Sequence, residues 1–251
     1  MASKALLSAF KANRPAFGVW LTAAGTFHAR TVAQASPHLS WVAVDCEHGI
    51  IPLVPGAAET VAAVHSAVPN GGGPSAIVRI AATAVSGSTS WQIKHALDAG
   101  ARGVIVPMVS TAEKAREIVA DSRFPPSGRR GFGSPYTHGI WGVGVSEYLS
   151  TANDDISVMV QIETPEGVKN MKEIAAVDDV LFIGPYDLSI SLGYPPPNPD
   201  PHPDVEKIIQ QVLAAAHGAG KKWYGDFCIN VTSDVGAMTQ GIAESLREAV
   251  Q

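Results

Sequence analysis

Several features that would direct a protein to the membrane or the cell exterior are scarce in this chain. The 251 residues contain two cysteines, Cys46 and Cys228, and both stand inside apolar runs. A disulfide framework is therefore not expected, and a reducing compartment fits best. No apolar run approaches the length of a membrane span. The stretch at residues 5–10 is too short for a signal peptide. We expect a cytoplasmic protein with no membrane partner.

An excess of basic charge is also missing. Lys and Arg number 18 against 23 Asp and Glu, so the net charge is −5. Nothing electrostatic therefore indicates a nucleic-acid partner. No GxGxxG motif follows the first predicted strand and no GxxxxGK[ST] motif occurs, which argues against a dinucleotide-binding sheet and a P-loop. The hydrophobic fraction of 46% is enough to bury a sizeable core.

Short apolar runs alternate with longer helical stretches along the chain. Near-continuous Val, Ile and Leu runs are typical of parallel strands covered on both faces. Alternating strands and helices, with no linker between two halves, predict a single α/β domain over residues 1–251, either a (β/α)8 TIM barrel or an open doubly wound sheet. The predicted strands are residues 17–22, 41–47, 76–80, 103–109, 158–163 and 180–184, with weaker candidates at 223–226 and 229–232. The predicted helices are residues 29–35, 55–67, 91–99, 112–121, 166–176, 205–217 and 235–249, and residues 124–148 are predicted to be a long loop.

Polar side chains stand where several of these apolar strands end. Asp45 and His48 follow the second strand, Arg79 lies on the third, and Gln161 and Glu163 end the fifth. The sixth strand is followed by Asp187. In a barrel the chemistry lies at the carboxyl ends of the strands. Charges at the edge of a buried core are unfavourable unless they are paired or bind a metal.

Glu163 and Asp187 are the strongest candidates for a metal site, because they end adjacent strands and their side chains can converge on one point. Each alone could be a solvated carboxylate or part of a helix start, since Pro165 follows Glu163 closely. For the pair we favour a divalent-metal site. Two carboxylates with open positions suit Mg²⁺ or Mn²⁺, and the sequence does not separate these from Co²⁺.

His48 and Arg79 are the candidate catalytic residues. His48 could be a structural histidine bonded to Asp45 or Glu47, but an acidic neighbour at a strand end favours proton transfer. Arg79 could merely neutralise one of those carboxylates. It could also hold a substrate carboxylate or a developing enolate oxygen.

Six motifs in order resemble the HpcH/HpaI aldolase family, and within it the fungal, macrophomate synthase-like branch. They are VDCEHG (44–49), VR (78–79), VPMVSTAEKA (106–115), GRRGFGSP (128–135), VQIET (160–164) and FIGPYDLS (182–189). The resemblance runs from about residue 17 to about residue 222.

The resemblance implies a metal-dependent carbon–carbon lyase that forms the enolate of pyruvate from a small-molecule 2-oxoacid. The reaction would be cleavage of a 4-hydroxy-2-oxoacid, decarboxylation of oxaloacetate, or both. It implies a (β/α)8 TIM barrel and a homo-oligomer, a hexamer or trimer. It also implies metal ligands at Glu163 and Asp187, proton transfer through His48 and enolate stabilisation by Arg79. The residues implied to line the substrate site are Trp20, Asp45, Gln161, Gly133 and Ser134.

The chain departs from the family pattern near its C-terminus. Residues 223–228 run directly into 229–234, where the family has a further helix. Parallel neighbours need a crossover of about a dozen residues. Either the barrel is shortened near strands seven and eight, or these residues form one strand, or a segment is absent from the sequence. Two other functions stay open: an acyl-CoA lyase of the citrate or malyl-CoA type, and a non-catalytic degenerate barrel subunit.

Overall fold

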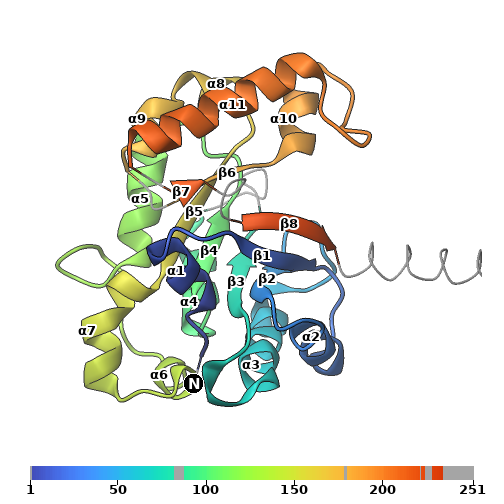
Figure 1. Cartoon of the computed structure of the whole chain (residues 1–251). Coiled ribbons are helices and arrows are strands. Elements are labelled where there is room, and N and C mark those ends of the chain that lie inside the picture. Colours follow the sequence, from blue (N-terminus) through green and yellow to red (C-terminus); the bar gives the residue numbers. More distant parts are fainter. Residues whose placement is uncertain (1, 82–87, 178–179, 221, 224–227, 234–251) are drawn as a thin grey trace, which may run out of the picture.

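The computed structural model describes residues 2–81, 88–177, 180–220, 222–223 and 228–233, and its centre is one parallel sheet (Figure 1). Eight strands are hydrogen-bonded in the order β7-β6-β5-β4-β3-β2-β1-β8. Every pairing is parallel. The strands are β1 (Ala16–Leu21), β2 (Leu39–Asp45), β3 (Ser75–Arg79), β4 (Gly103–Val106), β5 (Ser157–Ile162), β6 (Val180–Ile183), β7 (Lys222–Trp223) and β8 (Cys228–Ser233).

The predicted alternation of strands and helices is confirmed. Each of the first six predicted strands coincides with an observed one to within a few residues. The expected helices are α2 (Thr26–Ala33), α3 (Ala58–Ala67), α4 (Ser90–Asp98), α5 (Ala112–Ser122), α8 (Pro165–Lys169), α9 (Met171–Ala175) and α11 (Pro203–Gly218). A single turn, η1 (Leu53–Ala57), precedes α3, and a short 3-10 turn, η2 (Pro69–Gly71), follows it.

The loop predicted at residues 124–148 is confirmed only as far as residue 136. This segment holds α6 (Thr137–Trp141) and leads into α7 (Val145–Asp155). Its glycines and prolines hide the helical pattern, and tertiary burial decides it. The rings of Trp141 and Tyr148 pack edge-on with their centres 4.9 Å apart, and both side chains are buried. Two more helices were not predicted, α1 (Ala5–Lys11) and α10 (Pro185–Ser191).

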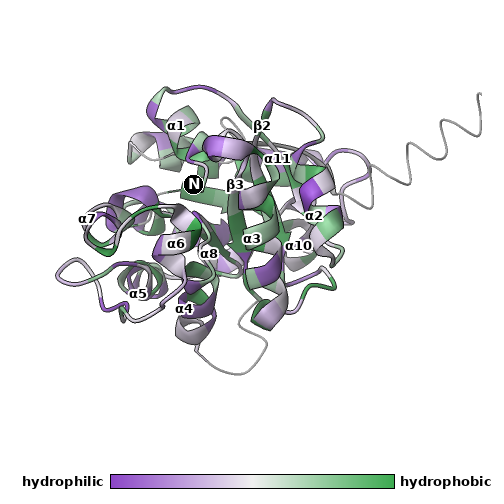
Figure 2. Cartoon of the chain, turned by 90° about the horizontal axis from the view of Figure 1, so that it is seen from below, coloured by the Kyte–Doolittle hydropathy of each residue, from purple (hydrophilic) through white to green (hydrophobic). Residues whose placement is uncertain are grey.

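The core consists of two layers of apolar side chains. The larger layer lies between the sheet and the surrounding helices, whose outward faces are polar (Figure 2). The smaller layer lies inside the curve of the sheet and includes Trp20, Trp41 and Phe182, with Leu6 and Phe10 of α1 packed against it. Gly18 is required there, because a Cβ at that position would lie 1.9 Å from the Trp41 ring.

The observed strands β7 and β8 lie at opposite edges of the sheet, and residues 224–226 of the predicted seventh strand lie outside the described residues. Residue Lys222 of β7 pairs with Val180, and Cys228 of β8 pairs with Ala16, so both lie at the end of the sheet where the strands begin. The one-strand alternative is therefore wrong. Among the described residues no ladder joins β7 to β8, so the structure shows a curled parallel sheet and not a closed barrel. The predicted helix at 235–249 lies outside the described residues.

None of the helices in the described part of the chain combines the length and apolar character that a membrane crossing requires.

Candidate active site

An ion pair joins the ends of two neighbouring strands. Asp45 ends β2 and is the register partner of Arg79, which ends β3. The Arg79 Nε donates to Asp45 Oδ1 at 2.9 Å and Nη2 donates to Oδ2 at 2.5 Å, a two-pronged pairing. The Arg79 guanidinium also stacks 4.3 Å from the centre of the Trp20 ring. The planar group is thereby held on one edge and on one face.

Asp45 is buried and pairs with Arg79. Its side chain is 2% exposed, and Oδ1 also accepts from the backbone N–H groups of Glu47 and His48. Burial alone would raise the pKa of Asp45. The hydrogen bonds and charge of Arg79, together with the two N–H groups, outweigh burial and hold that pKa below its ordinary value. Asp45 is therefore a carboxylate, and it orients the guanidinium.

Glu163, directly after β5, is the most confined carboxylate of the site. It is 1% exposed. Its Oε1 accepts from the backbone N–H of Met108 at 2.8 Å, and its Oε2 accepts from Gln161 Nε2 at 3.1 Å. Met108 has a left-handed backbone with φ of 56°, which is uncommon outside glycine. Such strain is concentrated at functional sites, and here it turns an N–H towards Glu163.

Burial raises the pKa of Glu163 to about 7, and the nearby carboxylates Asp187 and Glu47 contribute in the same direction. The Met108 N–H and the charge of Arg79 act in the opposite direction. The surroundings of Glu163 are therefore short of positive charge, because Arg79 does not offset burial and the acidic neighbours. That deficit is what a bound divalent metal would remove.

His48 lies at the open side of the same cluster. Its Nε2 is 3.6 Å from Glu47 Oε2 and 3.8 Å from Asp187 Oδ2. Glu47 in turn lies 3.5 Å from Arg79 Nε. The His48 side chain is 59% exposed and that of Asp187 41%, so a dissolved substrate can reach both. The structure thus brings together His48, Arg79, Asp45, Trp20, Gln161, Glu163 and Asp187.

The donor set fits a divalent cation held by two carboxylates. Within the described residues no group of three or more His, Cys, Asp or Glu side chains is arranged to enclose a metal on its own. Glu163 and Asp187 would supply two oxygen ligands and leave positions for substrate oxygens. Gln161 Oε1 is buried without a hydrogen-bond partner in the structure, an acceptor that an aqueous or substrate donor could satisfy.

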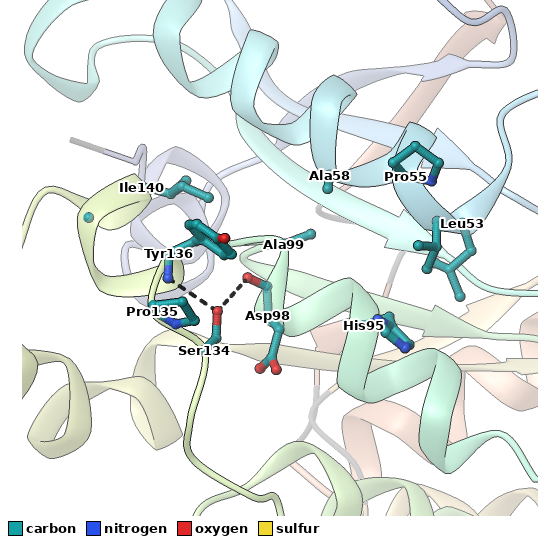
Figure 3. A pocket seen from close by; sticks show the side chains of 12 residues that line it. Leu53, Pro55, Ala58, His95, Asp98, Ala99, Ser134, Pro135, Tyr136 and Ile140 are labelled. Carbon is teal, nitrogen blue, oxygen red and sulfur yellow. Dashed lines mark hydrogen bonds between the residues drawn. The ribbon is translucent and has the colours of Figure 1, made fainter.

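Ser134 and Gly133 are not brought to this cluster within one chain. Ser134 lines a separate cavity of about 650 Å³ that α3, α4 and α6 border (Figure 3). Its hydroxyl lies 3.5 Å from the Asp98 carbonyl and accepts from Thr137 Oγ1 at 2.9 Å. Asp98 ends α4 just before β4 begins, whereas the cluster lies where the strands end. A role for these two residues stays a prediction.

Two features of the site were not assigned from the sequence: the Glu47 side chain and the Met108 N–H. The DCEH run could have indicated Glu47. No local pattern marks the Met108 N–H, because its role depends on a contact between residues remote in the chain. Burial, with Asp45 beside it, raises the pKa of the Cys46 thiol to about 12, which disfavours the reactive thiolate.

Comparison with known proteins gives a consistent result. A family model described as HpcH/HpaI aldolase/citrate lyase matches residues 16–245. A 4-hydroxy-2-oxo-heptane-1,7-dioate aldolase of Shigella sonnei (strain Ss046) is 38% identical over 221 residues, which are 85% of this chain and 77% of that protein.

Two solved structures extend the similarity to the fold. An HpcH/HpaI aldolase/citrate lyase family protein from Burkholderia cenocepacia J2315 has a TM-score of 0.84 at 30% identity, covering 98% of both chains. Macrophomate synthase has a TM-score of 0.83 at 26% identity, covering 98% of this chain and 88% of its own.

Proposed function

The chain belongs to the HpcH/HpaI aldolase/citrate lyase family, and from that premise we propose that the site around Arg79 and Glu163 generates the enolate of pyruvate from a 2-oxoacid. The chain is a lyase of the aldolase type that depends on a divalent metal, as the family does. The proposal adds the roles of the individual residues, Mg²⁺ as the resident ion and the substrate class. The non-catalytic alternative is not favoured.

Glu163 and Asp187 would hold the metal. When bound there, a divalent cation supplies a Lewis acid for the 2-oxo group and counters the charge of the buried carboxylates. The raised pKa of Glu163 and the unpartnered Gln161 Oε1 support this assignment. The nearness of further acidic groups to Glu163 is unfavourable without such an ion.

Arg79 supplies positive charge where the enolate oxygen develops. Asp45 and Trp20 fix its guanidinium before substrate arrives, so little reorganisation is needed during the reaction. Both Nε and Nη2 are engaged by Asp45, which leaves Nη1 and the second N–H of Nη2 as the donors for substrate.

His48 moves the proton of the 4-hydroxyl group. In aldol cleavage His48 Nε2 accepts that proton, directly or through water, and the C3–C4 bond breaks. The bonding pair passes to C3 and on to the 2-oxo oxygen, an aldehyde leaves, and protonation of C3 yields pyruvate. Decarboxylation of oxaloacetate reaches the same enolate by loss of CO₂ and needs no base.

The substrate class is proposed to be 4-hydroxy-2-oxoacids, the class to which the substrate named for the Shigella relative belongs. We propose that the protein works as a homo-oligomer.

One observation carries the proposal: a buried carboxylate, Glu163, lies among acidic groups beside an arginine that is already oriented. The test is oxaloacetate decarboxylation with and without Mg²⁺, on the wild type and on Glu163→Gln. We expect pyruvate release that requires the metal and is lost in the variant. Folded protein that shows no activity at saturating Mg²⁺ would refute the proposal.

A matched control tests whether loss of activity is specific to a glutamate of the site. Glu113 is an exposed glutamate on α5 whose only described partner is Arg116. Glu113→Gln makes the same chemical change on the surface and should keep wild-type activity. Loss of activity in both variants would point to instability and not to the metal site.

A further inference from the structure

Gly184 stands between β6 and α10, at the point where the chain turns towards Asp187. Its backbone has φ of −95° and ψ of 91°. Side chains adopt that region without strain, so the conformation does not require glycine. We therefore look for the reason in the space that a side chain at position 184 would occupy.

The space beside Gly184 is filled by the carboxylate of Glu163. A Cβ at position 184 would lie 2.1 Å from Glu163 Oε2 and 3.0 Å from Gln161 Nε2. The first distance is far inside van der Waals contact, so one of the groups would have to move. Gly218, in the last turn of α11, differs, because a Cβ added there would have nothing within 4 Å.

Glu163 has no room to retreat. It is 1% exposed, and each of its carboxylate oxygens accepts a hydrogen bond, one from the Met108 N–H and one from Gln161. Moving the carboxylate breaks at least one of these bonds in a closed surrounding. A methyl group at 184 would therefore displace the carboxylate and not merely press on it.

We propose that Gly184 is a positioning residue whose missing side chain seats the Glu163 carboxylate opposite Asp187. Gly184 and Asp187 are three residues apart, so the turn that leaves space for the Glu163 carboxylate also carries the carboxylate of Asp187. The far end of α10 is also tied to Glu163, because the Ser191 hydroxyl donates to the Glu163 carbonyl at 2.8 Å. The spacing of the two carboxylates is thus set by packing. The metal role of that spacing rests on the proposed function.

The first experiment measures Mn²⁺ binding by calorimetry on the wild type, Gly184→Ala and Gly218→Ala. Residues that orient a metal ligand typically contribute about 10- to 100-fold in affinity. We expect Gly184→Ala to weaken Mn²⁺ binding by about that factor and Gly218→Ala to leave it unchanged. Wild-type affinity in Gly184→Ala would overturn the inference. Absence of Mn²⁺ binding in the wild type would instead refute the proposed metal site.

The second experiment needs no metal. The melting temperature is measured for Gly184→Ala in the wild-type background and in a Glu163→Ala background, where the carboxylate no longer occupies the space. We expect a clear drop in the first background and little or none in the second. If Gly184→Ala does not fold alone, the double variant should recover folding. An equal loss in both backgrounds would show that the glycine serves the fold alone and would overturn the inference.

Discussion

At the scale of single residues, the site divides into groups held rigidly and groups left accessible. Arg79 is fixed by an ion pair and an aromatic face, and Glu163 by two hydrogen bonds in a buried position. His48 is more than half exposed beside two carboxylates. Rigid groups suit charge stabilisation, which gains from fixed dipoles, and an accessible imidazole suits proton exchange with substrate and water.

His48→Ala should harm aldol cleavage far more than decarboxylation. Aldol cleavage requires removal of a hydroxyl proton, and a positioned base typically contributes about 10²- to 10⁴-fold. Decarboxylation requires none, so its rate should change little. The measurement is kcat/KM for a 4-hydroxy-2-oxoacid and for oxaloacetate on the same preparations. Equal losses in both reactions would contradict the assignment.

The stability of the metal-free protein should fall as pH rises towards neutrality. Burial raises the pKa of Glu163 from its ordinary 4.5 to about 7, so between these values the folded state keeps a proton that the unfolded chain has released. The stabilisation is fully present below pH 4.5 and is lost as pH rises through about 7. It amounts to about 3 kcal/mol.

Urea denaturation with a chelator, at a series of pH values, measures this effect. Glu163→Gln cannot ionise and should lack this component of the pH dependence. A pH profile identical to that of the wild type would place the titration elsewhere. Added divalent metal should reverse the trend, because the cation binds the ionised carboxylate and competes with its proton.

At the scale of elements, the ladder between β2 and β3 joins the fold to the site. Asp45 and Arg79 are register partners at the ends of these strands, so the pairing that builds the sheet also sets the ion pair. A shift of either strand by one residue would turn its charged side chain to the other face and separate the pair. The order of the strands therefore determines which charges meet.

Asp45→Asn should destabilise the fold and slow enolate formation. The variant keeps the size of the side chain but removes the buried charge that pairs with Arg79 at two atoms, and only the longer ion-pair contact of Arg79 with Glu47 remains among the described residues. Breaking a buried pair from one side costs about 3 to 5 kcal/mol. Urea denaturation and the decarboxylation rate measure the two effects.

The control is Glu113→Gln, which breaks the exposed Glu113–Arg116 pair on α5. Exposed pairs contribute at most about 1 kcal/mol. If both variants lost the same stability, the Asp45–Arg79 pair would not hold the strand ends.

At the scale of the whole molecule, several large apolar side chains are exposed. Phe27 is 87%, Ile50 78% and Tyr136 72% exposed. Large apolar side chains with such exposure are candidates for burial between subunits. Tyr136 borders the cavity that also contains Ser134 (Figure 3).

Light scattering should therefore give the mass of a homo-oligomer, three or six times the 26.2 kDa of one chain. The apolar side chains above would be covered in such an assembly, which lowers the free energy of association. Measurement over a range of protein concentrations distinguishes a stable assembly from a weak one. A single-chain mass at every concentration would contradict the expectation.

Much of the site could be predicted because its residues follow apolar strands. Asp45, Arg79, Gln161 and Glu163 each lie at the end of a continuous apolar run, and the carboxyl ends of parallel strands meet at one edge. The helices α6, α7 and α10 could not be predicted, since their short or glycine-rich sequences carry little periodic signal. Burial of side chains such as Trp141 and Tyr148 decides their structure.

The sequence by itself determined the alternation of strands and helices, the set of charged residues at the strand ends and the family. These are local properties, encoded in runs of apolar residues and in short motifs. Only the tertiary structure decided that Asp45 holds Arg79, that Met108 turns an N–H to Glu163 and that Gly184 leaves room for that carboxylate. Those contacts join residues 34, 55 and 21 positions apart in the chain. Packing brings them together, and local sequence pattern carries no record of distances between remote residues.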